Sequence, residues 1–293
     1  MVSLTSHEQD GTKENAMPIE VCKLGAAAGA EIRGANLSRD LDAADFAAIR
    51  RALVDHGVIV LRGQDLAPDR HIAFTARFGA PDIHPLTQFH LPGHPEILVL
   101  SNRKRADGSP VGLEDAGRYW HTDVSFHKEP SLGSLLYAVE IPPAGGDTLF
   151  ANQYAAWDTL PAPMKERLRG KRAFHGLNRI VAPKFTEAQL AAVVPVPHPI
   201  ARRHPESGRL ALYAGRFAIA IEGMDDTESA DTLAFLYEHA GQEDFQYRHV
   251  WQQGDLVMWD NRGVLHHATP FDPQHIRHMH RTTVAGDVPA AAN

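Results

Sequence analysis

The second half of the chain is built from short apolar runs separated by turn residues, and the length of these runs constrains the fold more than any other feature. Leu135–Val139, for example, is followed by the turn-forming sequence Pro142–Gly146. Runs of about four to eight residues fit β-strands, whereas a helix needs about ten or more. We therefore expect strands at Leu135–Val139, Thr148–Phe150, Leu210–Tyr213, Phe245–Trp251, Asp255–Trp259 and Arg281–Val284.

Helical patterns concentrate in the first quarter of the chain and in insertions between strands. Asp42 is suited to cap a helix that runs to about His56 and is ended by Gly57. Neither G-x-G-x-x-G nor the P-loop motif occurs, which weakens a Rossmann or P-loop interpretation. We predict a mostly β fold with helical additions around an antiparallel barrel or jelly roll. Further expected elements are two short strands within 18–36, strands at Val58–Leu61 and Ile97–Leu100, and helices at 68–78, 152–169 with a break near 160, 182–192 and 226–240.

Charge and the chain ends narrow the class of protein further. The 29 Lys and Arg residues against 36 Asp and Glu give a net charge of −7, which argues against a nucleic-acid binder. The N-terminus has no basic cluster followed by an apolar core, and no apolar run is long enough to span a bilayer. We expect no membrane association, a cytoplasmic location, and a single domain over 17–288 between loose tails at 1–16 and 289–293.

Histidine is abundant and cysteine nearly absent, with 18 of the former and only Cys22 of the latter. Any metal site must therefore use histidine and carboxylate ligands. In Trp120–Asp123, residues His121 and Asp123 would face the same side of a strand, because side chains alternate there. A distant second histidine would complete a two-histidine, one-carboxylate set, the arrangement of non-haem Fe(II) oxygenases. As a bare pattern, however, His-x-Asp is more often a surface pair.

Four sequence blocks, taken together, favour metal ligation over a surface pair. They are Trp120–Phe126 (WHTDVSF), Gly145–Phe150 (GGDTLF), Trp259–His266 (WDNRGVLH) and Arg277–Arg281 (RHMHR). In this order and spacing the chain resembles the taurine dioxygenase/2,4-dichlorophenoxyacetate dioxygenase (TauD/TfdA) family, from about residue 18 to 288. The resemblance implies a double-stranded β-helix core, cupin-like, and an enzyme that uses Fe(II), 2-oxoglutarate and O2 and releases succinate and CO2.

The resemblance also implies roles for individual residues. His121, Asp123 and His266 would hold the iron. His267, which follows His266 directly, would point to the other side of a strand. Thr148 and Arg277 would bind the distal carboxylate of 2-oxoglutarate, and Arg281 would lie beside its chelating end and the anionic group of the substrate. Arginine suits planar carboxylates, and Arg277 and Arg281 are spaced to share one face of a strand. The remaining histidines at 275, 278 and 280 are expected to be packing or surface residues.

Substrate residues are suggested by fewer signals. Ile83-His84-Pro85 resembles the segment that supplies a sulfonate-binding histidine in the taurine branch, although a plain loop histidine is an equal alternative. Thr87 and Gly117 replace the two family residues that bind the taurine amine, so taurine itself is doubtful. The candidate apolar wall is Tyr119, Val124 and Phe126. We expect a small organic anion such as a sulfonate, an alkyl sulfate, or an aryloxy or other carboxylate, with 80–118 and 175–200 as lids.

Several alternatives remain open at this stage. Because Asp123 is present, hydroxylation is favoured over halogenation, in which a small residue replaces that ligand. A hydroxylase of an amino-acid-derived or trimethylammonium substrate would want an aromatic cage, for which no residues stand out. Alternatives of another class are a zinc hydrolase built on the same residues and a catalytically silent binding protein. Family members are often dimers or tetramers, which is analogy only.

Overall fold

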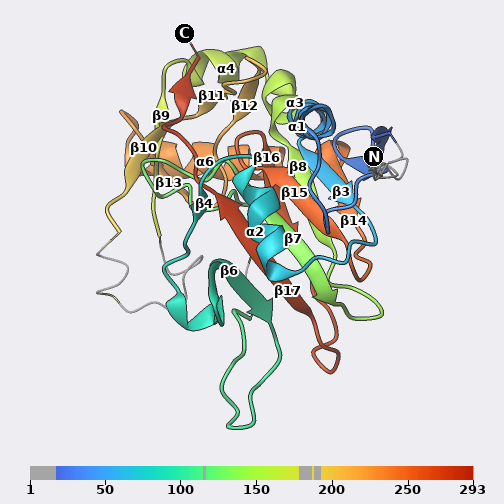
Figure 1. Cartoon of the computed structure of the whole chain (residues 1–293). Coiled ribbons are helices and arrows are strands. Elements are labelled where there is room, and N and C mark those ends of the chain that lie inside the picture. Colours follow the sequence, from blue (N-terminus) through green and yellow to red (C-terminus); the bar gives the residue numbers. More distant parts are fainter. Residues whose placement is uncertain (1–17, 115–116, 178–186, 188–192, 293) are drawn as a thin grey trace, which may run out of the picture.

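A computed structural model describes residues 18–114, 117–177, 187 and 193–292 of the chain. Its largest element among these residues is a nine-stranded sheet in the order β1-β2-β3-β15-β7-β17-β6-β5, with β4 paired to β17 (Figure 1). Only the β2–β3 pair is parallel. The strands are β1 Glu20–Lys23, β2 Ala30–Arg33, β3 Val58–Leu61, β4 Pro81–Asp82, β5 His90–Leu91, β6 His94–Ser101, β7 Gly133–Glu140, β15 Leu256–Asp260 and β17 His278–Val284.

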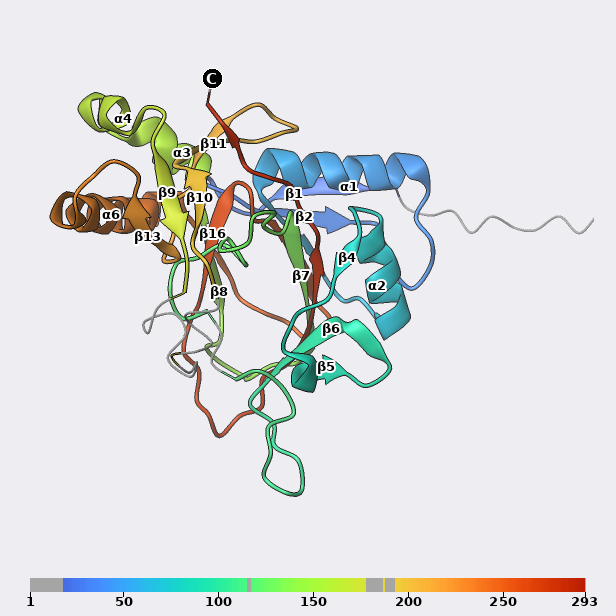
Figure 2. The same cartoon turned by 90° about the vertical axis from the view of Figure 1, so that its left-hand side faces the viewer.

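A smaller sheet, β14-β8-β16, faces the large one and closes the jelly roll, as the edge-on view in Figure 2 shows. Its strands are β8 Thr148–Asn152, β14 Gln246–His249 and β16 Val264–Ala268. Two further three-stranded sheets have the orders β10-β9-β13 and β12-β11-β18. They consist of β9 Arg172–His175, β10 Val196–Pro199, β11 Ala201–Arg203, β12 Leu210–Leu212, β13 Ala218–Ile221 and β18 Ala290–Ala291. The predicted mostly β, cupin-like fold class is confirmed.

Helices pack on the outside of both main sheets (Figure 2). Helices α1 and α2 lie against the large sheet, whereas α3 and α6 lie on the side of the small one. The helices are α1 Ala43–His56, α2 Pro68–Ala76, α3 Gln153–Thr159, α4 Ala162–Leu168 and α6 Asp226–Ala240, with short 3-10 turns at Thr87–Phe89 and Glu243–Phe245. Asp42 caps α1 as predicted by accepting a hydrogen bond from the amide of Asp45, and Gly57 ends the helix at φ 71°. No helix among the described residues is long and apolar enough to cross a membrane.

Alternation along the central strands explains why their sequences are apolar throughout. In β3, Ile59 and Leu61 join the core beneath α1 and α2, whereas Val58 and Val60 join the core between the two sheets. Strand β15 divides in the same way, with Trp259 on the inner side. Because neighbouring side chains point to opposite faces, a strand buried on both faces needs apolar residues at every position. A third core lies under α3 and α6.

The structure corrects three expectations. Residues 290–291 are not a loose tail, because β18 pairs with β11 and the amide of Ala292 donates to the carbonyl of Ala201. The interval 80–118 is not a lid throughout, because β6 is an integral strand paired with β17. The predicted strand Phe245–Trp251 is shorter, since Phe245 belongs to a 3-10 turn and β14 ends at His249. The helix expected at 182–192 lies outside the described residues, apart from 187.

The buried His71 makes the fold sensitive to acid. Its Nε2 lies 3.0 Å from the Oγ1 of Thr282, and burial, together with nearby His280, lowers the pKa of His71 to about 3. Below the ordinary value of 6.5 the unfolded chain binds a proton that the folded chain excludes. The free energy of unfolding therefore falls as the pH drops from 6.5 towards 3, by up to about 1.4 kcal/mol per pH unit for this residue.

We expect His71→Leu to reduce this slope by about that amount. Thr282 keeps a hydroxyl partner in Thr75, 2.7 Å away, so the substitution leaves no orphaned group. Urea unfolding of both proteins at pH 7, 6 and 5 measures the difference. Equal slopes for the two proteins would contradict a neutral, buried His71.

Candidate metal and co-substrate site

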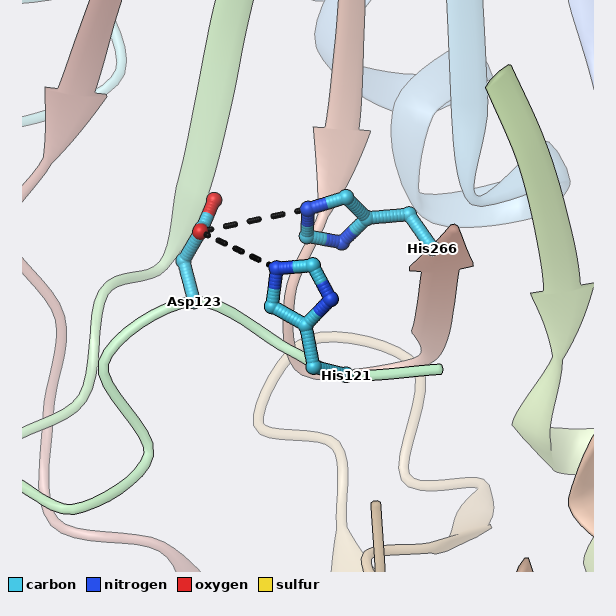
Figure 3. A group of neighbouring side chains, drawn as sticks. All are labelled: His121, Asp123 and His266. Carbon is cyan, nitrogen blue, oxygen red and sulfur yellow. Dashed lines mark ion pairs between the residues drawn. The ribbon is translucent and has the colours of Figure 1, made fainter. Parts of the chain in front are cut away.

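Two imidazoles and one carboxylate meet between the sheets. One donor atom from each of His121, Asp123 and His266 lies within 4.8 Å of the other two, and all three residues are buried (Figure 3). His266 belongs to β16, whose inner face also carries Val264, so the histidine points into the sandwich. Among the described residues this is the one cluster of three or more potential metal ligands with such spacing. The three residues singled out from sequence are thus brought together.

The backbone at His121 and Asp123 is not the strand that the sequence suggested. His121 and Asp123 do not share a strand: His121 forms an isolated bridge to β16, and Asp123 lies in a turn. The amide of His121 donates to the carbonyl of His266 at 3.1 Å, and the return bond is 2.8 Å. Val124 in the turn has φ 46°, which is costly for a β-branched residue. This turn, rather than strand alternation, aims Asp123 at the two histidines.

Both histidines present the same nitrogen. The Nε2 atoms of His121 and His266 each lie 3.9 Å from Oδ1 of Asp123. The Nδ1–H of His121 donates to the carbonyl of Tyr119 at 2.8 Å, which leaves the Nε2 lone pair free for a metal. Burial lowers the pKa of both histidines, so they are neutral near pH 7 and able to act as ligands.

Asp123 is held ionised by its neighbours. Burial alone would raise its pKa, but the guanidinium of Arg281, with Nη1 3.3 Å from Oδ1, holds the pKa below its ordinary value. The hydroxyl of Ser134 donates to Oδ2 at 2.6 Å, which leaves Oδ1 turned towards the imidazoles. A buried carboxylate with one oxygen hydrogen-bonded and one directed at two imidazoles suits a divalent cation.

Asn261, which the sequence reasoning did not single out, organises the support for this turn. Its side-chain oxygen accepts from the indole of Trp259 and the amide of Asp123, at 2.9 and 3.3 Å. Its side-chain amide donates to Ser131 and Ser134. The Trp259–His266 block contained this residue, but only the fold reveals that its partners are 127 and 130 positions away.

Arg277 and Thr148 lie on a separate part of the site. Arg277 precedes β17 instead of belonging to it, and it lines a cavity of about 280 Å³ together with Ala268. Thr148 is the strand partner of Ala268, and its Oγ1 accepts a hydrogen bond from the indole of Trp251 at 3.1 Å. Burial lowers the pKa of Arg277 to about 10, so it remains a cation. This cavity therefore offers a half-buried guanidinium to a carboxylate.

Arg281 lines a second, smaller cavity of about 80 Å³ with His84, Val124 and Asp123. Burial, followed by the proximity of Arg281, lowers the pKa of His84 to about 4, so the ring is neutral. The Nε of Arg281 is buried without a hydrogen-bond partner among the described residues. An unpaired buried donor that belongs to a cavity-lining residue is suited to bind an acceptor atom of a ligand.

Tyr119 and Phe126 belong to an aromatic group centred on Phe217, a residue that the sequence reasoning missed. Phe217 lies 6.0, 5.2 and 5.8 Å from the rings of Tyr119, Phe126 and His121. Gly117 adopts φ 79°, and a Cβ there would come 2.7 Å from Cε1 of His121. A side chain at position 117 therefore does not fit this backbone unless the ring of His121 moves.

The other histidines are placed elsewhere. His267 faces away from the site, with its ring 5.5 Å from that of Trp120, as expected from alternation. His278 and His280 pack against each other at 5.2 Å on β17. His275 is an exposed residue whose carbonyl accepts from Asn102.

Removing the Ser134 hydroxyl tests the support of the carboxylate. Ser134→Ala is expected to weaken divalent-metal binding by about 10-fold or more, because partners of a ligand typically contribute that much. Ser229→Ala deletes an equally buried hydroxyl in α6, bonded to the amide of Ile221, and serves as the control. Calorimetric titration with Mn(II) measures the metal affinity of both variants and of the original protein. Equal affinities in the two variants would refute a role for Ser134.

Comparison with known proteins gives a consistent set of similarities. The family model described as taurine catabolism dioxygenase TauD, TfdA family matches residues 20–283. The chain is 37% identical over 271 residues to an alpha-ketoglutarate-dependent 2,4-dichlorophenoxyacetate dioxygenase of Cupriavidus pinatubonensis, covering 88% of this chain and 94% of that one. It is 34% identical to an alpha-ketoglutarate-dependent sulfate ester dioxygenase of Pseudomonas putida, with 96% and 94% covered. A crystal structure of a taurine dioxygenase from Burkholderia xenovorans superposes with a TM-score of 0.80 at 36% identity, covering 94% and 93%.

Proposed function

The chain belongs to the TauD, TfdA family and is a 2-oxoglutarate-dependent dioxygenase, and we propose that it uses Fe(II) to hydroxylate a small organic anion. The observation that carries the metal assignment is the buried cluster of His121, Asp123 and His266. Two neutral imidazoles and one carboxylate suit Fe(II) and leave positions open on one side. Bound Fe(II) with 2-oxoglutarate and O2 would supply the oxidising chemistry, with succinate and CO2 as co-products.

The protein's own residues provide binding, orientation and exclusion of water. Arg277 and Thr148 are suited to the distal carboxylate of 2-oxoglutarate, because Arg277 offers a half-buried cation and Trp251 occupies an acceptor lone pair of the Thr148 hydroxyl. That contact leaves the hydroxyl proton of Thr148 available for donation to the co-substrate. Arg281 neutralises Asp123 and borders the smaller cavity. Trp259 and Phe150 pack beside His266 and keep that side of the site apolar.

The substrate proposal follows from the smaller cavity. Arg281 and His84 provide donors for an anionic group there, and the aromatic group of Tyr119, Phe126 and Phe217 provides an apolar surface near His121. Sulfonates, alkyl sulfates and aryloxy or other carboxylates share these properties. The names of two relatives, which refer to a sulfate ester and to an aryloxyacetate, support the same class. We propose hydroxylation as the outcome because Asp123 retains the carboxylate ligand.

The direct test is succinate release from 2-oxoglutarate in the presence of Fe(II), O2 and a panel of these anions. Product mass must be measured as well, because uncoupled decarboxylation also gives succinate. Coupled product formation with at least one organic anion, and none without Fe(II) or 2-oxoglutarate, is the expected result. Hydrolysis of a panel member without 2-oxoglutarate would instead favour the zinc hydrolase.

Arg277→Lys tests the co-substrate assignment. Lysine keeps the charge but loses the two-pronged geometry of the guanidinium, so we expect the KM for 2-oxoglutarate to rise by about 10-fold or more. The KM for the organic anion should stay within about twofold, since Arg277 lines only the larger of the two cavities described above. Initial rates with one substrate varied at a time measure both constants. A change confined to the organic anion would reverse the assignment.

A further inference from the structure

The smaller cavity carries a third potential donor that neither the family resemblance nor the comparisons assign. His127 lines it together with His84 and Arg281, so three nitrogen-bearing side chains from three separate segments border one space of about 80 Å³. We propose that His127 is a specificity-determining residue that completes a three-donor site for the head group of a sulfate ester or sulfonate. The proposal deepens the proposed function and rests on it for the use of this cavity by the substrate.

The first two donors are already directed by their contacts. Nη1 of Arg281 contacts Oδ1 of Asp123, whereas the buried Nε of Arg281 has no partner among the described residues. The amide of Leu86 donates to Nδ1 of His84, so the ring proton of the neutral imidazole lies on Nε2. Arg281 and His84 thus each retain an N–H group for a ligand.

The main chain of His127 is fixed while its ring remains available. Its amide donates to the carbonyl of Val124 at 2.9 Å, and its carbonyl accepts from Nε2 of His198 at 2.9 Å. A second buried histidine, His175, contacts the hydroxyl of Ser125 in the same turn at 2.9 Å. The ring of His127 is exposed and has no hydrogen-bond partner in the part of the chain that the structure describes. A fixed backbone with an unpaired imidazole at a cavity mouth suits recognition of a ligand.

The charges of the cavity favour a third donor. Asp123 and Asp82 also line it, and a bound anion would be repelled by both carboxylates. Asp123 is compensated by the guanidinium of Arg281, whose Nη1 lies 3.3 Å from Oδ1. Asp82 has no such cation among the cavity-lining residues beyond Arg281 itself. Additional N–H donors offset this repulsion, and His127 supplies one.

The number of donors favours a particular head group. A carboxylate offers two oxygens, whereas the head group of a sulfate ester or sulfonate offers three, one for each of Arg281, His84 and His127. Since a water molecule takes about 30 Å³ in the liquid, the cavity accommodates a head group rather than a whole substrate. Phe126, whose ring lies 4.9 Å from that of His127, is then positioned beside the apolar remainder.

The test compares an alkyl sulfate with the alkyl carboxylate of matched length. His127→Leu should raise the KM for the sulfate by about 10-fold, the effect of losing one hydrogen bond to a charged group, and leave the carboxylate within about twofold. His127→Gln retains an N–H donor and should lie closer to the original protein. Lys128→Ala removes a cation from the same turn that does not line the cavity and should change neither. The KM for 2-oxoglutarate should be the same in all four proteins.

Calorimetric binding of the two anions to the metal-free protein separates this proposal from the proposed function. The original protein should bind the sulfate more tightly than the carboxylate, and His127→Leu should lose that preference even if no anion in the panel is turned over. No preference in the original protein, an equal effect of His127→Leu on both anions, or the same effect from Lys128→Ala would each overturn the proposal. Absence of turnover with intact, His127-dependent binding would overturn only the proposed function.

Discussion

Two main-chain hydrogen bonds between His121 and His266 determine where the site lies, and the rest of the arrangement depends on them. They attach a loop to the edge of β16 and bring the centroids of the two imidazole rings to 4.0 Å from each other. The turn that follows directs Asp123 at both rings. The two bonds join positions 145 residues apart in the chain, so the three side chains meet only in the folded jelly roll.

The charges around Asp123 and the positions of the two arginines give each polar group of the site a distinct role. Ionising the buried Asp123 alone would be costly, but Arg281 forms an ion pair with it and the hydroxyl of Ser134 donates to its Oδ2. Removing one partner of such a set is destabilising by about 3–5 kcal/mol, because it leaves a buried charge uncompensated. Arg277 and Arg281, four residues apart, serve different cavities because Arg277 precedes β17 and Arg281 lies within it. A substrate anion and a co-substrate carboxylate can therefore be bound separately.

The strands and helices could be predicted from the sequence where burial dictates the pattern. Val58–Leu61 is buried on both faces, and Asp42 and Gly57 mark the ends of α1 through their local geometry. Motif order was sufficient to select His121, Asp123 and His266, but it suggested a strand where the chain makes a turn, because a left-handed Val124 leaves no local signal. Asn261, Phe217 and His127 could not be selected, since their roles arise from partners distant in sequence.

The central claim is that His121, Asp123 and His266 hold the metal, and adjacent histidines in β16 allow it to be tested within one strand. His266 faces Asp123, whereas His267 faces Trp120. The measurement is the metal content of the original protein, His266→Ala and His267→Ala after anaerobic loading with Fe(II) and desalting. We expect one iron per chain in the original protein and in His267→Ala, and little in His266→Ala. Full retention of iron by His266→Ala, or its loss in His267→Ala alone, would contradict it.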